Sequence, residues 1–154
     1  RDATMVGSMK AWAMAQSATG HAPVYSYQFA RPHTFAPGAT FTDLDPATAG
    51  SYHTSEVPFW LGTLDTFNAY RTTRAWTAAD RAFSGAMTDS LVAFAKTGVP
   101  DTAAFKWRRF DPQHPRLLEL GAQAREQDWP EEAKLAFFRD TPRAAPVAPG
   151  AVRD

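Results

Sequence analysis

The chain has 154 residues, a length that corresponds to about one globular domain. Its 16 basic and 16 acidic residues balance, which argues against a nucleic-acid partner, because phosphate binding needs a clustered excess of Lys and Arg. No apolar run approaches the roughly 18 residues of a membrane-spanning helix, and the absence of cysteine excludes disulfides, thiolate nucleophiles and Cys-bound zinc.

Aromatic residues and prolines are the unusual part of the composition. The sequence contains 11 Phe, 5 Trp, 4 Tyr and 12 Pro, so the chain has much apolar surface to bury and many irregular connections. It begins Arg-Asp-Ala-Thr without an initiator Met. We therefore expect either a processed start or a piece of a longer chain.

A predicted helix and a predicted strand open the chain. Side chains that recur at helical spacing predict the helix over residues 2–17, which Gly20 ends. Residues 22–29 are rich in β-forming types and bounded by two prolines, which predicts the strand. A helix followed directly by a strand is typical of an α/β fold. The helix positions are Met5, Met9, Trp12 and Gln16, and the strand places Tyr25, Tyr27 and Phe29 on one face.

A long loop and two further helices follow. Residues 31–51 contain several Pro and Gly and show no sustained period, and loops of this length inside a compact domain are usually functional. Pro58 sets the first turn of a short apolar helix that Thr54 or Ser55 can cap. The clearest helix starts at Thr77 with a variant of the capping box and ends at a Gly-Val-Pro sequence. Its apolar stripe consists of Phe83, Met87, Leu91 and Phe94.

The last third of the chain contributes a second predicted strand at residues 115–120 and a closing helix at residues 131–138. Residues 1–140 are then expected to be part of a single domain, and residues 141–154 form a Pro/Ala-rich tail. Two strands are marginal alone and cannot cover the apolar faces of four helices. We therefore expect the aromatic side chains to pack against strands outside this chain.

Four histidines are the candidates for acid–base chemistry. His21 and His114 lie next to Gly and Pro and are expected to be surface turn residues, and His33 in the long loop is given the same interpretation. His53 differs because it precedes a helix start and has Glu56 three residues further on. From these residues alone, His53 is either a buried structural histidine or half of a metal site that no second His-x-x-Glu completes. We expect neither a metal nor a cofactor.

Three sequence blocks occur in an order that is typical of one enzyme family. Residues 49–62 read Ala-Gly-Ser-Tyr-His-Thr-Ser-Glu-Val-Pro-Phe-Trp-Leu-Gly, and residues 94–100 read Phe-Ala-Lys-Thr-Gly-Val-Pro. Residues 107–111 begin the third block, which continues through the strand at 117–120 to the Leu-Ala-Phe-Phe that ends at Phe138. These blocks resemble type-B carboxylesterases, the cholinesterase-like branch of the α/β-hydrolases. The first resembles their catalytic-histidine segment, and the resemblance extends over residues 1 to about 140.

The resemblance implies an α/β fold that is the C-terminal portion of an α/β-hydrolase, and hydrolysis of carboxylic esters through a Ser-His-Glu/Asp triad. Triad residues in such hydrolases occur in the order Ser, acid, His. No Gly-x-Ser-x-Gly exists in this sequence, because Ser51 and Ser84 each have Gly on one side only. The nucleophile, the oxyanion glycines and the triad acid are therefore expected on an upstream N-terminal portion of the same esterase. In this interpretation the enzyme acts on a small-molecule carboxylic ester only when the two portions are combined.

The resemblance also implies roles for individual residues. His53 is the general base and acid of the triad. Glu56 is either the glutamate that the family places behind the triad or a carboxylate that caps a helix N-terminus. The family commonly has Gly or Ala after the histidine, whereas this chain has Thr54, whose branched side chain narrows the allowed backbone. Candidates for lining the substrate pocket are Ser55, Val57, Phe35 and Phe41, whereas Phe59 and Trp60 are expected in the core rather than the pocket.

Two other classes of function stay open. A catalytically inactive esterase-like binding or adhesion domain would keep the fold without the triad, and His53 at its motif position argues against this class. A self-standing helical binding module is disfavoured by the small number of predicted strands. The Ala-, Arg- and Pro-rich composition is typical of a high-GC bacterial source, and a secreted or periplasmic location is favoured over a cytoplasmic one.

Overall fold

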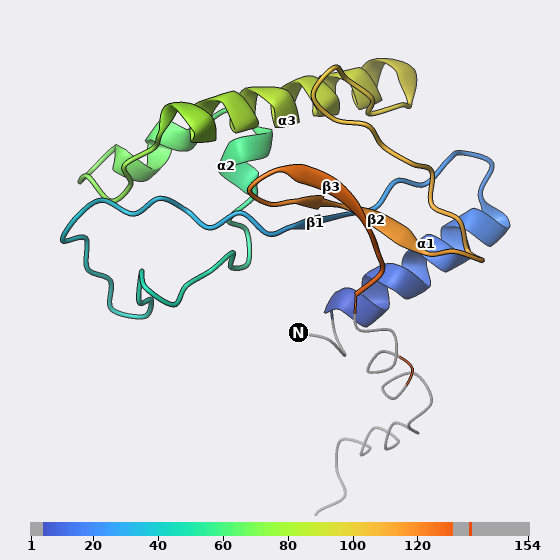
Figure 1. The fold of residues 1–154 in the computed structure, drawn as a ribbon, viewed down its shortest axis with the longest axis horizontal. Helices are drawn as coiled ribbons and strands as arrows, with labels where there is room; N and C mark the ends of the chain where they lie inside the picture. The colour runs from blue at the N-terminus through green and yellow to red at the C-terminus, as the bar shows by residue number, and fades with distance from the viewer. Residues whose placement is uncertain (1–4, 131–135, 137–154) are drawn as a thin grey trace, which may run out of the picture.

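The computed structural model describes residues 5–130 and residue 136, and it has an α/β fold, as predicted (Figure 1). The predicted closing helix at 131–138, apart from residue 136, and the tail at 141–154 lie outside the described residues. The elements in chain order are α1 (Gly7–Thr19), β1 (Tyr27–Phe29), α2 (Val57–Trp60), the 3-10 helix η2 (Leu64–Asn68), α3 (Ala78–Thr97), β2 (Arg116–Leu120) and β3 (Ala124–Asp128).

A three-stranded sheet in the order β1-β2-β3 lies at the centre of the described chain. β1 runs parallel to β2, and β3 pairs antiparallel to β2 after a turn at residues 121–123. β3 corrects the sequence prediction, which expected two strands. Its side chains are mostly polar and carry no strand pattern, and cross-strand ion pairs join it to β2: Arg125 to Glu119 at 2.8 Å and Arg116 to Asp128 at 3.0 Å.

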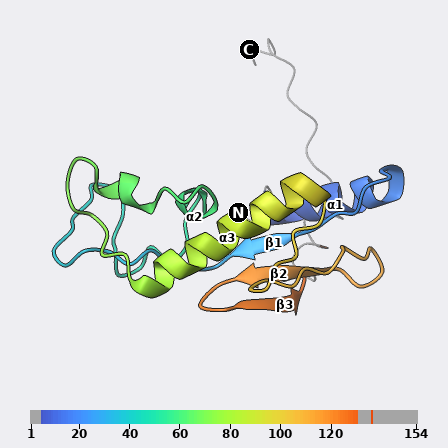
Figure 2. The same ribbon diagram turned by 90° about the horizontal axis from the view of Figure 1, so that it is seen from above.

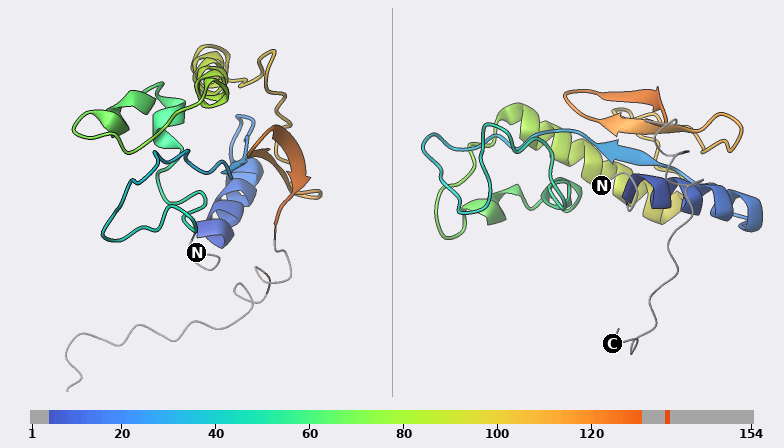
Figure 3. Two further views of the ribbon diagram at one scale, coloured as in Figure 1. Left: turned by 60° about the vertical axis from the view of Figure 1, so that its left-hand side comes forward. Right: turned by 90° about the horizontal axis from the view of Figure 1, so that it is seen from below.

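The sheet is the middle of three layers, with α2 and α3 on one face and α1 on the other (Figures 1 and 3). Successive side chains of β2 point to opposite faces, so Leu117 belongs to one buried cluster while Leu118 and Leu120 belong to another. This arrangement is the layered packing of α/β domains. The cluster under α2 and α3 consists of Phe59, Leu64, Met87, Phe105, Leu118 and Leu120, and the cluster beside α1 consists of Ala13, Phe110, Leu117 and Trp129.

Helix α1 confirms the predicted helix but leaves most of its large apolar side chains exposed. Ala13 is its buried residue, whereas Trp12 is 66% exposed and Met5 and Met9 are also exposed. The predicted strand at 22–29 is likewise shorter in the structure, because only residues 27–29 pair with β2 in a regular ladder.

Helix α3 confirms the predicted start and end. Thr77 Oγ1 accepts a hydrogen bond from the Asp80 amide at 3.1 Å, and Asp80 Oδ2 accepts one from the Thr77 amide at 2.9 Å, which completes the capping box. Gly98 ends the helix with a φ of 73°, a left-handed conformation that glycine adopts without steric cost. Half of the predicted apolar stripe is not buried, because Leu91 and Phe94 are exposed. The buried residues of the helix are Asp80, Ser84, Met87 and Ser90.

Candidate functional site

His53 lies in a turn that is held at the carboxyl end of β1. The loop that begins after β1 runs out beyond this end of the sheet and returns to it before α2 (Figure 2). Ser51 Oγ donates a hydrogen bond of 3.1 Å to the carbonyl oxygen of Phe29, the last residue of β1. In α/β sheets, ligands bind beyond the carboxyl ends of parallel strands. The fold therefore places His53 on the edge of the sheet where such folds carry their chemistry.

The His53 residue is exposed, and its ring makes no hydrogen bond with any residue in the described part of the chain. The backbone around it is tightly folded: the Ser55 amide donates to the Tyr52 carbonyl at 3.0 Å and the Val57 amide to the Thr54 carbonyl at 3.1 Å. The turn thus holds the histidine by its backbone, and the residue stays exposed.

Thr54 has a φ of 67°, a left-handed conformation that a β-branched residue rarely adopts. Glycine would adopt this conformation without steric cost. The Thr54 hydroxyl donates to the His53 carbonyl at 2.6 Å, which partly offsets the strain. The turn beside His53 therefore stores backbone strain, as functional sites often do.

Thr54→Gly is expected to raise the free energy of unfolding by about 0.5–1 kcal/mol, because the relief of left-handed strain exceeds the added flexibility of glycine in the unfolded chain. Urea denaturation of the two proteins measures the change. Thr63→Gly is the control, since Thr63 is exposed and has a φ of −109°, and it is expected to lower stability. A Thr54→Gly protein less stable than the parent would show that the turn is not strained.

His33 was predicted to be a surface turn residue, and this prediction is wrong because the residue is buried. It is 4% exposed and is surrounded by the rings of five aromatic residues. Its Nε2 lies 2.8 Å from the Ser55 carbonyl oxygen, which can only accept, so Nε2 carries the proton. Its Nδ1 accepts from Arg74 Nε at 3.0 Å and lies 2.9 Å from the Tyr52 hydroxyl. Ring centroids lie 4.9–6.3 Å from that of His33 for Phe35, Tyr52, Phe59, Phe67 and Trp76.

The guanidinium of Arg74 is buried beside His33, and Phe rings rather than a carboxylate surround it in the described part of the chain. Arg74 Nη2 donates to the Tyr52 hydroxyl at 2.9 Å, which closes a triangle with His33. Cation–π contacts with rings at 4.3–5.2 Å help to compensate its burial. The rings are those of Phe35, Phe41 and Phe67.

Asp80 ties the start of the long loop to α3. Its carboxylate accepts two hydrogen bonds from Arg31, at 2.8 and 2.9 Å, and one from Thr34 at 2.9 Å, in addition to the capping bonds from Thr77. Burial by itself would raise the pKa of Asp80, but the hydrogen bonds from Thr77, Arg31 and Thr34 outweigh it and hold this pKa below its ordinary value. Because His33 lies between Arg31 and Thr34 in sequence, this charged cluster fixes the segment that carries it.

The other predicted site residues occupy different environments. Glu56 stands at the N-cap position of α2 and forms no side-chain cap bond, so the predicted capping of α2 by Thr54, Ser55 or Glu56 is wrong. Burial raises the pKa of Tyr27, and the negative charge of nearby Glu56 adds to this increase. Ser55 is fully buried, and its hydroxyl has no hydrogen-bond partner within residues 5–130 or at residue 136, whereas Val57 is exposed. Phe35 and Phe41 pack on Arg74, and their role in a substrate pocket stays a prediction.

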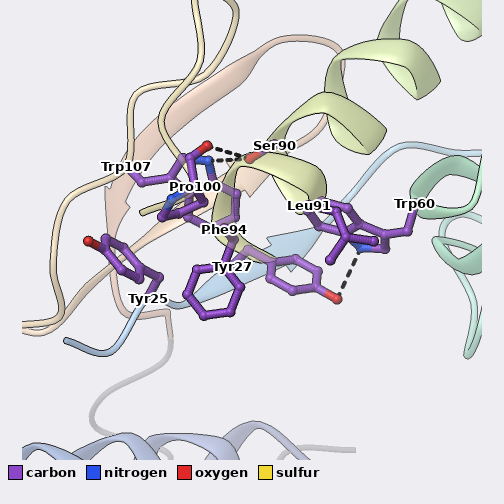
Figure 4. Close-up of a pocket in the computed structure, with 8 residues that line it drawn as sticks. All are labelled: Tyr25, Tyr27, Trp60, Ser90, Leu91, Phe94, Pro100 and Trp107. Atoms are coloured by element: carbon purple, nitrogen blue, oxygen red, sulfur yellow. Dashed lines mark hydrogen bonds between the residues drawn. The ribbon is translucent and has the colours of Figure 1, made fainter. Parts of the chain in front are cut away.

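An aromatic pocket of about 300 Å³ lies between β1, α2, the C-terminal half of α3 and the segment after it (Figure 4). Tyr27 and Trp60 meet in its wall through a hydrogen bond from Trp60 Nε1 to the Tyr27 hydroxyl at 3.2 Å. Trp60 therefore lines a pocket, whereas Phe59 is fully buried in the core as expected. The lining residues are Tyr25, Tyr27, Trp60, Ser90, Leu91, Phe94, Pro100 and Trp107.

Comparison with known proteins identifies the family. The pattern that defines the Carboxylesterase family matches residues 3–138, which is most of the chain. The chain belongs to the carboxylesterase family. A search of curated proteins found no significant match.

Solved esterases share the α/β-hydrolase fold of this carboxylesterase chain. A PNB esterase matches 83% of this chain at 26% identity with a TM-score of 0.61, and a thermophilic PNB esterase matches 83% at 26% identity with a TM-score of 0.65. An esterase from anaerobic Clostridium hathewayi, described as able to hydrolyse aliphatic aromatic polyesters, matches 85% at 17% identity with a TM-score of 0.66, and supports the fold alone. The chain spans only 23–24% of the length of these proteins.

Two general features of the described residues complete the site. No helix among them is long and apolar enough to cross a membrane. No group of three or more His, Cys, Asp or Glu side chains within residues 5–130 or at residue 136 could hold a metal ion.

Proposed function

We propose that this chain supplies the general base and acid, His53, to a serine carboxylesterase. The observation that carries the proposal is the position of an exposed histidine in a turn that Ser51 fastens to the carboxyl end of β1. Membership of the carboxylesterase family and the fold shared with PNB esterases support it. The complete enzyme is then this chain together with the segment that carries the nucleophile.

His53 acts in both halves of the reaction. Its Nε2 takes the proton of the serine hydroxyl as the serine oxygen bonds to the ester carbonyl carbon, and it then gives that proton to the departing alkoxide as the ester C–O bond breaks. In the second half His53 takes a proton from water, which attacks the acyl-enzyme, and returns it to the serine oxygen. Histidine suits this work because its ordinary pKa of about 6.5 lies near neutral pH.

The triad acid and the nucleophile belong to an N-terminal portion of the same esterase in this proposal. The related esterases are about three and a half times as long as this chain, which leaves ample length for that portion. A Glu or Asp from it accepts a hydrogen bond from His53 Nδ1 and fixes the tautomer. Glu56, one turn beyond His53, holds the loop behind the triad rather than replacing that acid. The substrate is a small-molecule carboxylic ester.

Intact mass spectrometry of the native and the denatured sample tests whether the chain works within a complete enzyme. We expect a second polypeptide, or a longer parent chain, that contains a Gly-x-Ser-x-Gly serine to accompany the 16.9 kDa chain. A folded native species of 16.9 kDa that hydrolyses no ester would contradict the proposal and would favour the inactive esterase-like binding domain.

A further inference from the structure

The turn that carries His53 is fastened on both sides by one buried side chain. His33 Nε2 donates to the carbonyl of Ser55, two residues after His53, at 2.8 Å, and His33 Nδ1 lies 2.9 Å from the hydroxyl of Tyr52, the residue before His53. His33 is also anchored outside this turn. The segment around it is anchored to α3 through the bonds from Arg31 and Thr34 to Asp80.

The hydrogen bonds of His33 require the neutral ring with its proton on Nε2. The Ser55 carbonyl can only accept, and Arg74 Nε can only donate, so one ring nitrogen must be protonated and the other must not. A second proton on Nδ1 would break the bond from Arg74 Nε and would place the positive charges of the ring and the Arg74 guanidinium side by side, while the Ser55 carbonyl and the Tyr52 hydroxyl can both accept from the charged ring. The negative charge of Asp80 acts in the opposite direction and raises the pKa of His33. The other groups around the ring are uncharged aromatic rings of α2, η2 and the segment before α3.

We propose that His33 is a positioning residue for His53, and that protonation of His33 sets its ring against the buried Arg74 guanidinium, displaces the turn fastened to the ring and inactivates the enzyme in acid. This inference rests on the proposed role of His53. Burial and the neighbouring Arg74 lower the pKa of His33, whereas the Ser55 carbonyl and Asp80 raise it. At neutral pH the ring is therefore uncharged and keeps its contacts with Ser55 and Tyr52, which together we call the clamp. As the pH falls through the lowered pKa of His33, the charged ring and Arg74 repel each other, and the turn moves with the ring.

The pH dependence of hydrolysis tests the clamp in the complete enzyme, with p-nitrophenyl acetate as the probe substrate. In the wild type the acid limb of log kcat/KM against pH should reach a slope of about 2, because His53 and His33 each take up one proton as the pH falls. His33→Gln keeps an amide that can donate to the Ser55 carbonyl but has no titrating ring, so its acid limb should reach a slope of about 1, from the uptake of one proton by His53. His114→Gln, at an exposed histidine, should leave the two-proton limb unchanged. A folded fraction that is the same at every pH lowers log kcat/KM by a constant amount and leaves this slope unchanged.

His33→Phe separates positioning from binding, because it removes both hydrogen bonds while keeping an aromatic ring in the cluster. We expect kcat to fall about 10- to 100-fold, as for other small misplacements of a catalytic group, with KM changed less than about threefold. His33→Gln should recover most of that loss.

Each outcome has a distinct meaning. A one-proton limb in the wild type, or an unchanged two-proton limb in His33→Gln, overturns the inference about His33 while leaving His53 as the base. Activity that survives His53→Ala overturns the proposed function, and with it the inference. A His33→Phe enzyme with the wild-type kcat also contradicts the clamp.

Discussion

His53→Ala is expected to lower kcat of the complete enzyme by at least about 10⁴-fold while the protein stays folded. Without an imidazole at this turn nothing removes the proton from the serine hydroxyl or protonates the leaving alcohol. The fold should survive because His53 is exposed and its ring forms no hydrogen bond with the described residues. Its removal therefore leaves neither a cavity nor a buried polar group without a partner.

Release of p-nitrophenol from p-nitrophenyl acetate measures this effect, and the circular dichroism spectrum and thermal midpoint confirm that the variant is folded. His21→Ala is the matched control, because His21 is also an exposed histidine and lies in the connection before β1. It should keep the wild-type kcat. A loss of less than tenfold in His53→Ala would remove His53 from the triad.

The largest effect on stability is expected from Asp80→Ala. Asp80 is 1% exposed and accepts hydrogen bonds from Arg31, Thr34 and Thr77. Its removal leaves the Arg31 guanidinium nearly buried without its carboxylate and deletes half of the capping box of α3. Breaking a buried ion pair in this way costs about 3–5 kcal/mol of the free energy of unfolding, which urea denaturation of the complete enzyme measures.

An exposed ion pair on the same helix provides the control for Asp80→Ala. Asp65 pairs with Arg81 of α3 at 2.7 Å, but both side chains are more than half exposed, so Asp65→Ala should change the urea midpoint little. Equal losses in the two variants would contradict the special role of Asp80. Because the pKa of Asp80 is held below its ordinary value of 3.8, its carboxylate stabilises the fold above that pH. This contribution is lost as the pH falls through the lowered pKa.

Local patterns in the sequence predicted the elements whose signals lie within a few residues. Thr77 and Asp80 form the capping box that their spacing indicates, and Pro58 occupies the first turn of α2 as expected. The segment around His53 was found from its resemblance to a family segment, and its place at the carboxyl end of β1 follows from the bond between Ser51 and Phe29.

The features that sequence reasoning missed depend on contacts between distant residues. β3 carries mostly polar side chains and becomes a strand through its pairing with β2, including the ion pair between Arg116 and Asp128. His33 lies in a Pro-containing loop with no periodic pattern, and its burial is created by Arg74, 41 residues further along the chain. The sequence around His33 and the sequence around Arg74 each carry no signal for the contact between these two residues.

Labelling with a fluorophosphonate, which bonds to the activated serine of an esterase, tests the central claim most directly. The complete enzyme and its His53→Ala variant are each treated with the reagent, and the labelled peptide is identified by mass spectrometry. We expect one labelled serine, located outside these 154 residues, and a labelling rate that is orders of magnitude lower in His53→Ala than in the wild type. A label on a serine of this chain, or a labelling rate that does not depend on His53, would contradict it.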